Sequence, residues 1–188
     1  AVAQGVYFDA AKAQEELQLG LADMGLASAA ELPAITVEFG TSPVLSAVAQ
    51  ALQAMWQQTL DVQVELSQID NTVYWSKQEQ DPGQIFRAGW CPDYNDTNNY
   101  LADVYRSDSI YNYGHWTHPE YDPLVDEARV ETDPDKRLEL YTRAEILLNV
   151  EDAGTMSLYY PVVAQLTQPN VERRSEEHTS ELQSLAVI

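Results

Sequence analysis

The sequence predicts an α/β fold built on a mostly parallel sheet, and three observations point to this class. Residues 35–39 (ITVEF) alternate apolar and polar side chains in the manner of a β-strand. Residues 43–59 then place apolar side chains at helical spacing, namely Leu45, Val48, Ala49, Leu52 and Trp56. Residues 62–66 and 85–90 are predicted as two more strands around a short helix at 71–78, and this alternation favours right-handed crossovers between parallel strands.

Further elements are expected on both sides of this segment. Asp9 is a typical N-cap for a helix that runs to about Met24, where Gly25 would end it. After residue 90 the pattern changes to loop and helix, and the stretch DYNDTNN at 93–99 is rich in turn-forming residues. Helices are predicted within 117–131, with Pro119 in its first turn, and within 132–150, and residues 155–166 are predicted to be extended. The second helix presents one apolar face, made of Leu140, Ala144, Leu147 and Leu148.

Composition excludes several classes of partner. The 188 residues suit one domain or one lobe, and 45% of them are hydrophobic, so a substantial core is expected. Thirty acidic side chains against ten basic ones give a net charge of −20. Such a chain repels nucleic acid and anionic membranes. It also contains no run of about 20 apolar residues that could span a membrane. We therefore expect no nucleic-acid partner and no membrane span.

The C-terminal tail differs in kind from the rest. Residues 174–184 (RSEEHTSELQS) follow none of the earlier patterns. They match the in-frame translation of a common sequencing-adapter oligonucleotide, although an ordinary polar tail is the alternative. We interpret residues 174–188 as adapter-derived, not biological, and expect them to make few core contacts.

Metal binding and catalysis find little support in the motifs. Asp93 opens a stretch that superficially resembles a calcium loop, but its sixth and twelfth positions are Asn98 and Val104 instead of Gly and Glu. His115 and His118 are three residues apart, a spacing that does not place both rings on one helical face. Thirty acids offer many carboxylate pairs, so a hydrolase cannot be singled out from composition. We expect no metal, no cofactor and no catalytic residue.

The strongest candidate site follows the third predicted strand, in RAGWCPDYND. Arg87, Trp90 and Asp93 lie at the carboxyl end of that strand, where open α/β sheets bind ligands, and Asn112 follows after a loop. A cation, an aromatic face, an anion and an amide suit a zwitterionic ligand, with Asp93 facing its amino group and Arg87 its carboxylate. The alternative is structural, because Arg87 could instead pair with a neighbouring acid.

Several motifs in one order resemble the family-5 extracellular solute-binding proteins of ABC importers, especially their oligopeptide-binding members. They are FDAAKAQEEL at 8–17, TSPVLSAVAQALQAMW at 41–56, IFRAGWCPDYN at 85–95, the stretch from His118 to Glu145, and LYYPVVAQLTQP at 158–169. The resemblance implies one lobe of a periplasmic-binding-protein type II-like clamp, with residues 1–173 as a partial C-terminal lobe. It also implies a peptide ligand, ABC importer permease subunits as partners, no enzymatic activity, and a periplasmic or extracellular location, lipid-anchored or not.

Site residues follow from the same resemblance. Asp93 is similar to the aspartate that receives the ligand's α-amino group, and Arg87 to a cation near the ligand's C-terminus. Trp90 and Asn112 resemble pocket walls. Cys91 matches a cysteine that in some members is disulfide-bonded to an earlier one, so its partner would lie in sequence missing from this chain.

Three departures from the family pattern weaken the expectation that the ligand's C-terminal carboxylate is captured. Asn71 stands where relatives often carry a pocket tryptophan, Gln78 where one has a second cation, and Pro161 where the third of three tyrosines is usual. Another solute, such as a sugar, an opine or a metal chelate, therefore remains an alternative ligand. A secreted hydrolase is the alternative outside the class.

Overall fold

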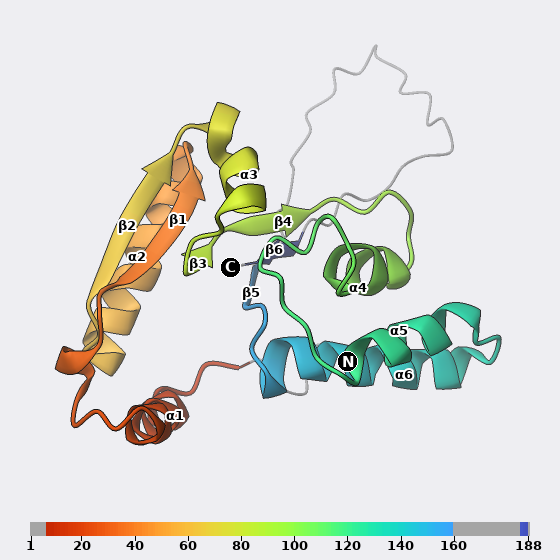
Figure 1. Ribbon diagram of the computed structural model, residues 1–188, viewed down its shortest axis with the longest axis horizontal. Coiled ribbons are helices and arrows are strands. Elements are labelled where there is room, and N and C mark those ends of the chain that lie inside the picture. Colours follow the sequence, from red (N-terminus) through yellow and green to blue (C-terminus); the bar gives the residue numbers. More distant parts are fainter. Residues whose placement is uncertain (1–6, 160–184, 188) are drawn as a thin grey trace, which may run out of the picture. The chain divides into compact units, whose positions relative to one another are not determined.

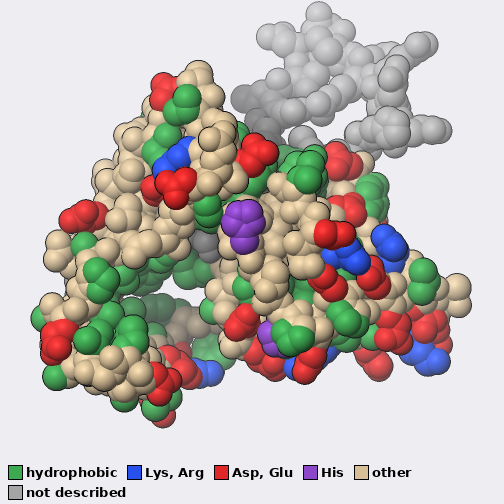
Figure 2. All heavy atoms as spheres, viewed as in Figure 1, with side chains coloured by type: hydrophobic (Ala, Val, Ile, Leu, Met, Phe, Trp, Pro, Cys, Tyr) green, Lys and Arg blue, Asp and Glu red, His purple; other side chains and the backbone are tan. Residues whose placement is uncertain are grey.

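The structure, a computed structural model, describes residues 7–159 and 185–187 (Figure 1). The chain divides into two compact units, one from Tyr7 to Arg87 and the other from Ala88 onward. No helix among the described residues has both the length and the hydropathy that crossing a membrane requires. Acidic side chains are spread over the visible surface of both units (Figure 2).

The first unit is a parallel three-stranded sheet with helices, as the sequence predicts. Its strand order is β2 (Val64–Ile69), β1 (Ile35–Gly40), β3 (Ile85–Phe86), and both pairings are parallel. Helix α2 (Pro43–Leu60) connects β1 to β2 and packs on both, and α3 (Asn71–Gln80) leads towards β3. Helix α1 (Ala10–Asp23) and the short 3-10 helix η2 (Ala29–Glu31) precede β1. The predicted α/β class and parallel sheet are therefore confirmed.

Local sequence signals explain where these helices begin and end. The carboxylate of Asp9 accepts a hydrogen bond from Lys12 N at 2.9 Å, and Gly25 adopts a φ of 70° just after α1. Ser42 caps α2, and Asp61 ends it in the left-handed conformation. The predicted apolar face of α2 turns inward, with Ala49 and Leu52 buried. Strand β2 begins two residues later than predicted, although Val62 is already buried beside Val64.

The third predicted strand is wrong as a single element, because it breaks at Arg87. Residues Ile85–Phe86 pair with β1 in the first unit, and β4 (Ala88–Trp90) belongs to the second unit. Arg87 N still donates to Glu38 O at 2.8 Å, so the parallel ladder extends one residue beyond β3 before the chain leaves the sheet. Alternation continues through IFRAGW, which is why the sequence pattern does not reveal the change of partner.

Helices form the core of the second unit. Helices α4 (Asn98–Tyr105), α5 (Tyr121–Val130) and α6 (Pro134–Ile146) are followed by one π-helical turn, η3 (Leu147–Glu151), and α5 and α6 lie side by side. Helix α4 is missing from the sequence-based prediction. Helix α5 starts later than predicted: Pro119 precedes it, in a turn closed by Tyr121 N donating to His118 O. The core comprises Leu101, Ala102, Tyr121, Val125, Ala128, Tyr141, Ala144 and Leu148.

A small antiparallel sheet completes this unit, in the order β4, β6 (Leu185–Val187), β5 (Ser157–Tyr159). Three residues of the tail therefore form main-chain pairs with β4 and β5, whereas the expectation that the tail makes few core contacts stays a prediction. Main-chain pairing needs no particular side chains, so it carries no information about the origin of the tail. The remaining tail residues, 174–184 and 188, and Pro161 lie outside the described residues.

Candidate functional site

The loop between β4 and α4 is organised by one buried amide, that of Asn99. Asn99 Oδ1 accepts hydrogen bonds from Trp90 Nε1 at 2.8 Å and from Asp93 N at 2.9 Å. Asn99 lies in the first turn of α4 and is only 2% exposed. The side chain of Trp90 and the main chain of Asp93 are thus fixed to the same rigid element.

Asp93 presents its carboxylate to solvent. The side chain is exposed, and Asn99 Nδ2 lies 3.5 Å from Asp93 Oδ2, at the limit of a hydrogen bond. Within the described residues, no Lys, Arg or His forms an ion pair with Asp93. A negative charge that is oriented but not neutralised suits a cationic group on a ligand.

An aromatic pair belongs to the same part of the structure, since Trp90 Nε1 and Asp93 N donate to the same Asn99 oxygen. Trp90 is partly buried, and its ring lies 4.6 Å from that of Tyr111, centroid to centroid, with a tilt of 56° between the planes. Tyr111 was not predicted as a site residue, although it directly precedes Asn112 in the sequence. Together the two rings offer an apolar face to a bound molecule.

Asn112 is occupied by its own loop. It is 6% exposed, its Nδ2 donates to Trp116 O at 2.7 Å, and its Oδ1 accepts from Trp116 N at 3.1 Å. The amide thereby closes the turn that contains His115, whose φ is 51°. The expectation that Asn112 lines a ligand pocket stays a prediction, and the observed geometry gives it a supporting role in the loop.

Arg87 belongs to the first unit, whereas Trp90, Asp93 and Asn112 belong to the second. Its carbonyl accepts a 2.6 Å hydrogen bond from the hydroxyl of Tyr74, which is 3% exposed. Burial raises the pKa of that Tyr74 hydroxyl, which keeps it protonated as a donor. Arg87 Nε is buried and has no hydrogen-bond partner among the described residues, and no ion pair joins Arg87 to an acid there. The structural alternative, pairing with a neighbouring acid, therefore finds no support within this part of the chain.

The two described departures from the family pattern both have structural partners. Gln78 is completely buried, donates to Glu38 Oε2 at 2.8 Å, and accepts from Gly83 N at 3.1 Å. Asn71 Nδ2 donates to Thr41 O at 2.8 Å at the start of α3. Both amides thus stabilise the local fold of the first unit.

Two further residues near this loop, Asp96 and Cys91, differ in whether they have a partner. Asp96 accepts a 2.8 Å salt bridge from Arg137 on α6, and this hydrogen bond lowers the pKa of Asp96. Cys91 is exposed and free, so its disulfide to a residue outside this chain stays a prediction. The part of the chain that the structure describes contains no group of three or more His, Cys, Asp or Glu arranged to hold a metal.

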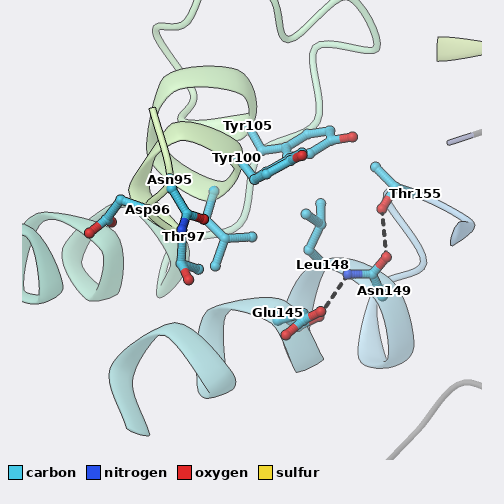
Figure 3. A pocket seen from close by; sticks show the side chains of 10 residues that line it. Asn95, Asp96, Thr97, Tyr100, Tyr105, Glu145, Leu148, Asn149 and Thr155 are labelled. Carbon is cyan, nitrogen blue, oxygen red and sulfur yellow. Dashed lines mark hydrogen bonds between the residues drawn. The ribbon is translucent and has the colours of Figure 1, made fainter. Parts of the chain in front are cut away.

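A cavity of about 240 Å³ lies beside this loop, between α4 and the end of α6 (Figure 3). Tyr100 and Tyr105 line one side of it, with Glu145, Leu148 and Asn149 on the other. Burial raises the pKa of Glu145. None of the four predicted ligand-binding residues lines this cavity.

Comparison with known proteins identifies the class. The sequence model of bacterial extracellular solute-binding proteins, family 5 Middle, matches residues 2–112. This match covers more than half of the 188 residues. The chain therefore belongs to the family 5 extracellular solute-binding proteins, which confirms the resemblance inferred from the motifs.

Individual relatives sharpen the placement. The chain is 38% identical over 152 residues to the oligopeptide-binding protein OppA of Bacillus subtilis (strain 168), which is 81% of this chain and 28% of that protein. It is 33% identical over 121 residues to the probable deoxycholate-binding periplasmic protein YgiS of Escherichia coli (strain K12), covering 64% of this chain and 22% of the relative.

Solved structures agree with this placement. The crystal structure of Haemophilus influenzae OppA in complex with RPPGFSPFR superposes with a TM-score of 0.67 at 27% identity, over 74% of this chain and 27% of that one. The chain thus spans less than a third of the length of these relatives, and its fold is that of part of a type II periplasmic binding protein.

Proposed function

We propose that this chain is part of the substrate-binding component of an ABC importer, and that the whole protein captures peptides between two lobes. The observation that carries the proposal is the loop from Trp90 to Asp93. Asp93 has an exposed carboxylate that is oriented by Asn99 and free of an ion pair among the described residues, and the same Asn99 holds Trp90, whose ring packs on Tyr111. The similarity to oligopeptide-binding proteins supports the assignment of a peptide to that loop.

Asp93 is the proposed receptor for the peptide's α-amino group. An ammonium group that is enclosed by two lobes loses its water and needs a charged partner. Arg87 is the proposed counterpart towards the ligand's carboxylate, and its buried Nε lacks a partner within the described residues. Trp90 and Tyr111 provide contact area for the peptide backbone and side chains, and no chemical step is involved.

Location and partners follow from the family. A solute-binding protein of this kind acts in the periplasm or outside the cell and delivers its ligand to membrane permease subunits of an ABC importer. Closure of the two lobes around the ligand would be the signal that the permease recognises.

A different solute is the second candidate, and one observation favours it. The relative YgiS is described as probably binding deoxycholate, which carries a carboxylate but no amine. For such a ligand Asp93 would not pair with a cation, and the aromatic face would contribute most of the contact.

The test uses the longer protein that contains this chain, with Asp93→Asn as the variant. Asn keeps the size of the side chain and removes its charge. Breaking a desolvated charge pair costs on the order of 2–5 kcal/mol, so peptide affinity should fall by roughly thirtyfold or more in titration calorimetry. N-acetylated peptides should bind the unaltered protein correspondingly badly.

Asp96→Asn is the matched control, because Asp96 lies in the same loop but already pairs with Arg137. This variant should change peptide affinity much less. Equal binding of acetylated and free peptides by the unaltered protein would refute the amine-receptor role and favour the second candidate. Turnover of a peptide or glycoside panel would instead favour a hydrolase.

A further inference from the structure

We propose that Asn99 is the positioning residue of the amine site: its amide fixes Trp90 and Asp93 in one geometry and thereby sets the preference for a free ligand amine. This inference rests on the proposed function, since it assigns a role to Asn99 in the same site. Asn99 does not contact the ligand in this proposal. It acts through the two residues that do.

Asn99 is the one side chain among the described residues that hydrogen-bonds to both Trp90 and Asp93. Its Oδ1 receives the indole N–H of Trp90 and the main-chain N–H of Asp93 at once. A carbonyl oxygen has two lone pairs, so these two donors use its full capacity. Rotation of the indole or of the loop main chain would leave a buried amide oxygen without its donors, which is costly.

The amide nitrogen adds an electrostatic function. Asn99 Nδ2 donates to Asp103 Oδ2 at 3.0 Å and lies 3.5 Å from Asp93 Oδ2. A neutral donor between two carboxylates partly offsets their mutual repulsion. Asp93 can therefore hold its charge close to a second acid without turning away from it.

Asn99 is itself held rigidly, as a positioning residue must be. Its neighbours in α4, Leu101 and Ala102, are buried in the core of the second unit, and Tyr121 anchors the helix by donating to Leu101 O at 2.9 Å. Asn99 N also donates to Asp96 O at 3.1 Å. The geometry of the site is thus set by a helix packed in the core rather than by the loop alone.

The experiment compares Asn99→Leu with Asn98→Leu in the longer protein. Leu has the branched shape of Asn with larger methyl groups in place of the amide atoms, so the first variant removes the hydrogen bonds without opening a cavity, and the extra volume is the same in the control variant. Asn98 is the matched control: it precedes Asn99 in α4, is 8% exposed, and hydrogen-bonds to Tyr94, Asp103 and Tyr141 instead of Trp90 or Asp93. Both variants should lose similar stability, so a difference between them reports positioning.

The first readout needs no ligand. Solvent exchange of the Trp90 indole N–H, followed by NMR, should accelerate roughly fivefold or more in Asn99→Leu, as expected for loss of about one hydrogen bond. Asn98→Leu should leave it unchanged. A third variant, Asn99→Asp, keeps an acceptor oxygen and should keep the indole proton protected.

The second readout is the ratio of affinities for a free and an N-acetylated form of one peptide. Asn99→Leu should reduce this ratio by roughly tenfold relative to the unaltered protein, because Asp93 is no longer preorganised. Asn98→Leu should keep the ratio.

The outcomes separate the two proposals. If the unaltered protein itself shows no preference for the free amine, the amine-receptor role is wrong, and the role of Asn99 in selecting an amine falls with it. If that preference exists but Asn99→Leu retains it, or Asn98→Leu loses it equally, only the positioning role is wrong. Unchanged indole exchange in Asn99→Leu would also overturn it.

Discussion

The two units share one hydrogen-bonding arrangement, but the carboxylate in it is neutralised in the first unit and exposed in the second. In each, a buried helix amide bonds a carboxylate through its nitrogen and a main-chain N–H through its oxygen: Gln78 holds Glu38 and Gly83 N, and Asn99 holds Asp93 and its N–H. Glu38 is 8% exposed and also pairs with Lys77 at 2.8 Å, so its charge is neutralised within the unit. Asp93 is exposed and has no such cation among the described residues.

The difference shows what separates a structural acid from a candidate binding acid in this chain. Both carboxylates are oriented by an amide, so orientation alone does not mark function. The distinguishing features are access to solvent and the lack of an internal cation. Substitutions at the two amides, and at the tyrosines and acids beside them, can test this distinction.

The largest expected effect is the loss of Gln78. Gln78→Leu removes the donor to a nearly buried carboxylate and leaves Gly83 N without its acceptor. Each unsatisfied buried polar group costs about 1–3 kcal/mol, so the free energy of unfolding should fall by about 2–4 kcal/mol in urea denaturation. The matched control is Gln80→Leu, an exposed glutamine of the same helix, which should change stability by less than about 0.5 kcal/mol. Equal effects of the two substitutions would show that the buried amide is not a structural link.

A smaller effect is expected from the loss of one tyrosine hydroxyl in each unit. Tyr74 is buried and donates to the carbonyls of Arg87 at 2.6 Å and Glu38 at 3.3 Å. Tyr94 is 44% exposed and donates to Asp103 at 2.7 Å. Tyr74→Phe should therefore cost about 1–2 kcal/mol, and Tyr94→Phe less than about 0.5 kcal/mol, because water can replace the exposed partner. A larger loss for Tyr94→Phe in the same denaturation assay would contradict the view that the first unit depends more on closed polar contacts.

The sequence predicts the first unit well because its elements carry local signals. Helices α1 and α2 combine a capping residue with an apolar period, and β1 alternates, so each is recognisable within its own residues. The break at Arg87 cannot be recognised from local residues, because it depends on which strand pairs with residues 88–90. That choice is made by distant segments, which alternation within IFRAGW cannot encode.

Helix α4 and its site are harder to predict for a related reason. The buried face of this helix includes Asn98 and Asn99, and a polar pair at the start of an eight-residue helix looks like a turn. Trp90 and Asp93 are predicted as site residues by their position after the third predicted strand and by the resemblance to a family. No sequence motif identifies Asn99, because its role depends on the four hydrogen-bonding groups that the fold brings around its side chain.

The smallest predicted effect on stability concerns Asp96. It tests whether an ion-paired acid of this loop contributes to stability in a way that distinguishes it from the unpaired Asp93. Asp96 pairs with Arg137, and both side chains are 30% exposed. The hydrogen bond from Arg137 holds the pKa of Asp96 below its usual value of 3.8. A carboxyl whose pKa is lower in the folded than in the unfolded state stabilises the fold above the unfolded pKa, and this contribution is lost as the pH falls through the folded pKa.

Asp96→Asn should therefore lower the free energy of unfolding by about 0.5–1 kcal/mol at pH 7. The difference from the unaltered chain should shrink once the pH falls below about 3.8, as the native carboxyl becomes protonated. In an Arg137→Met background the same substitution should change stability little at any pH, because the pair no longer exists. Urea denaturation of the four variants from pH 7 to pH 3 measures this cycle. An equal difference without Arg137 would show that Asp96 stabilises the loop through the hydrogen bond that it accepts from Asn98 N alone. A pH-independent difference would show that the charge of Asp96 contributes nothing, and in either case Asp96 would no longer serve as a charge-paired contrast to Asp93.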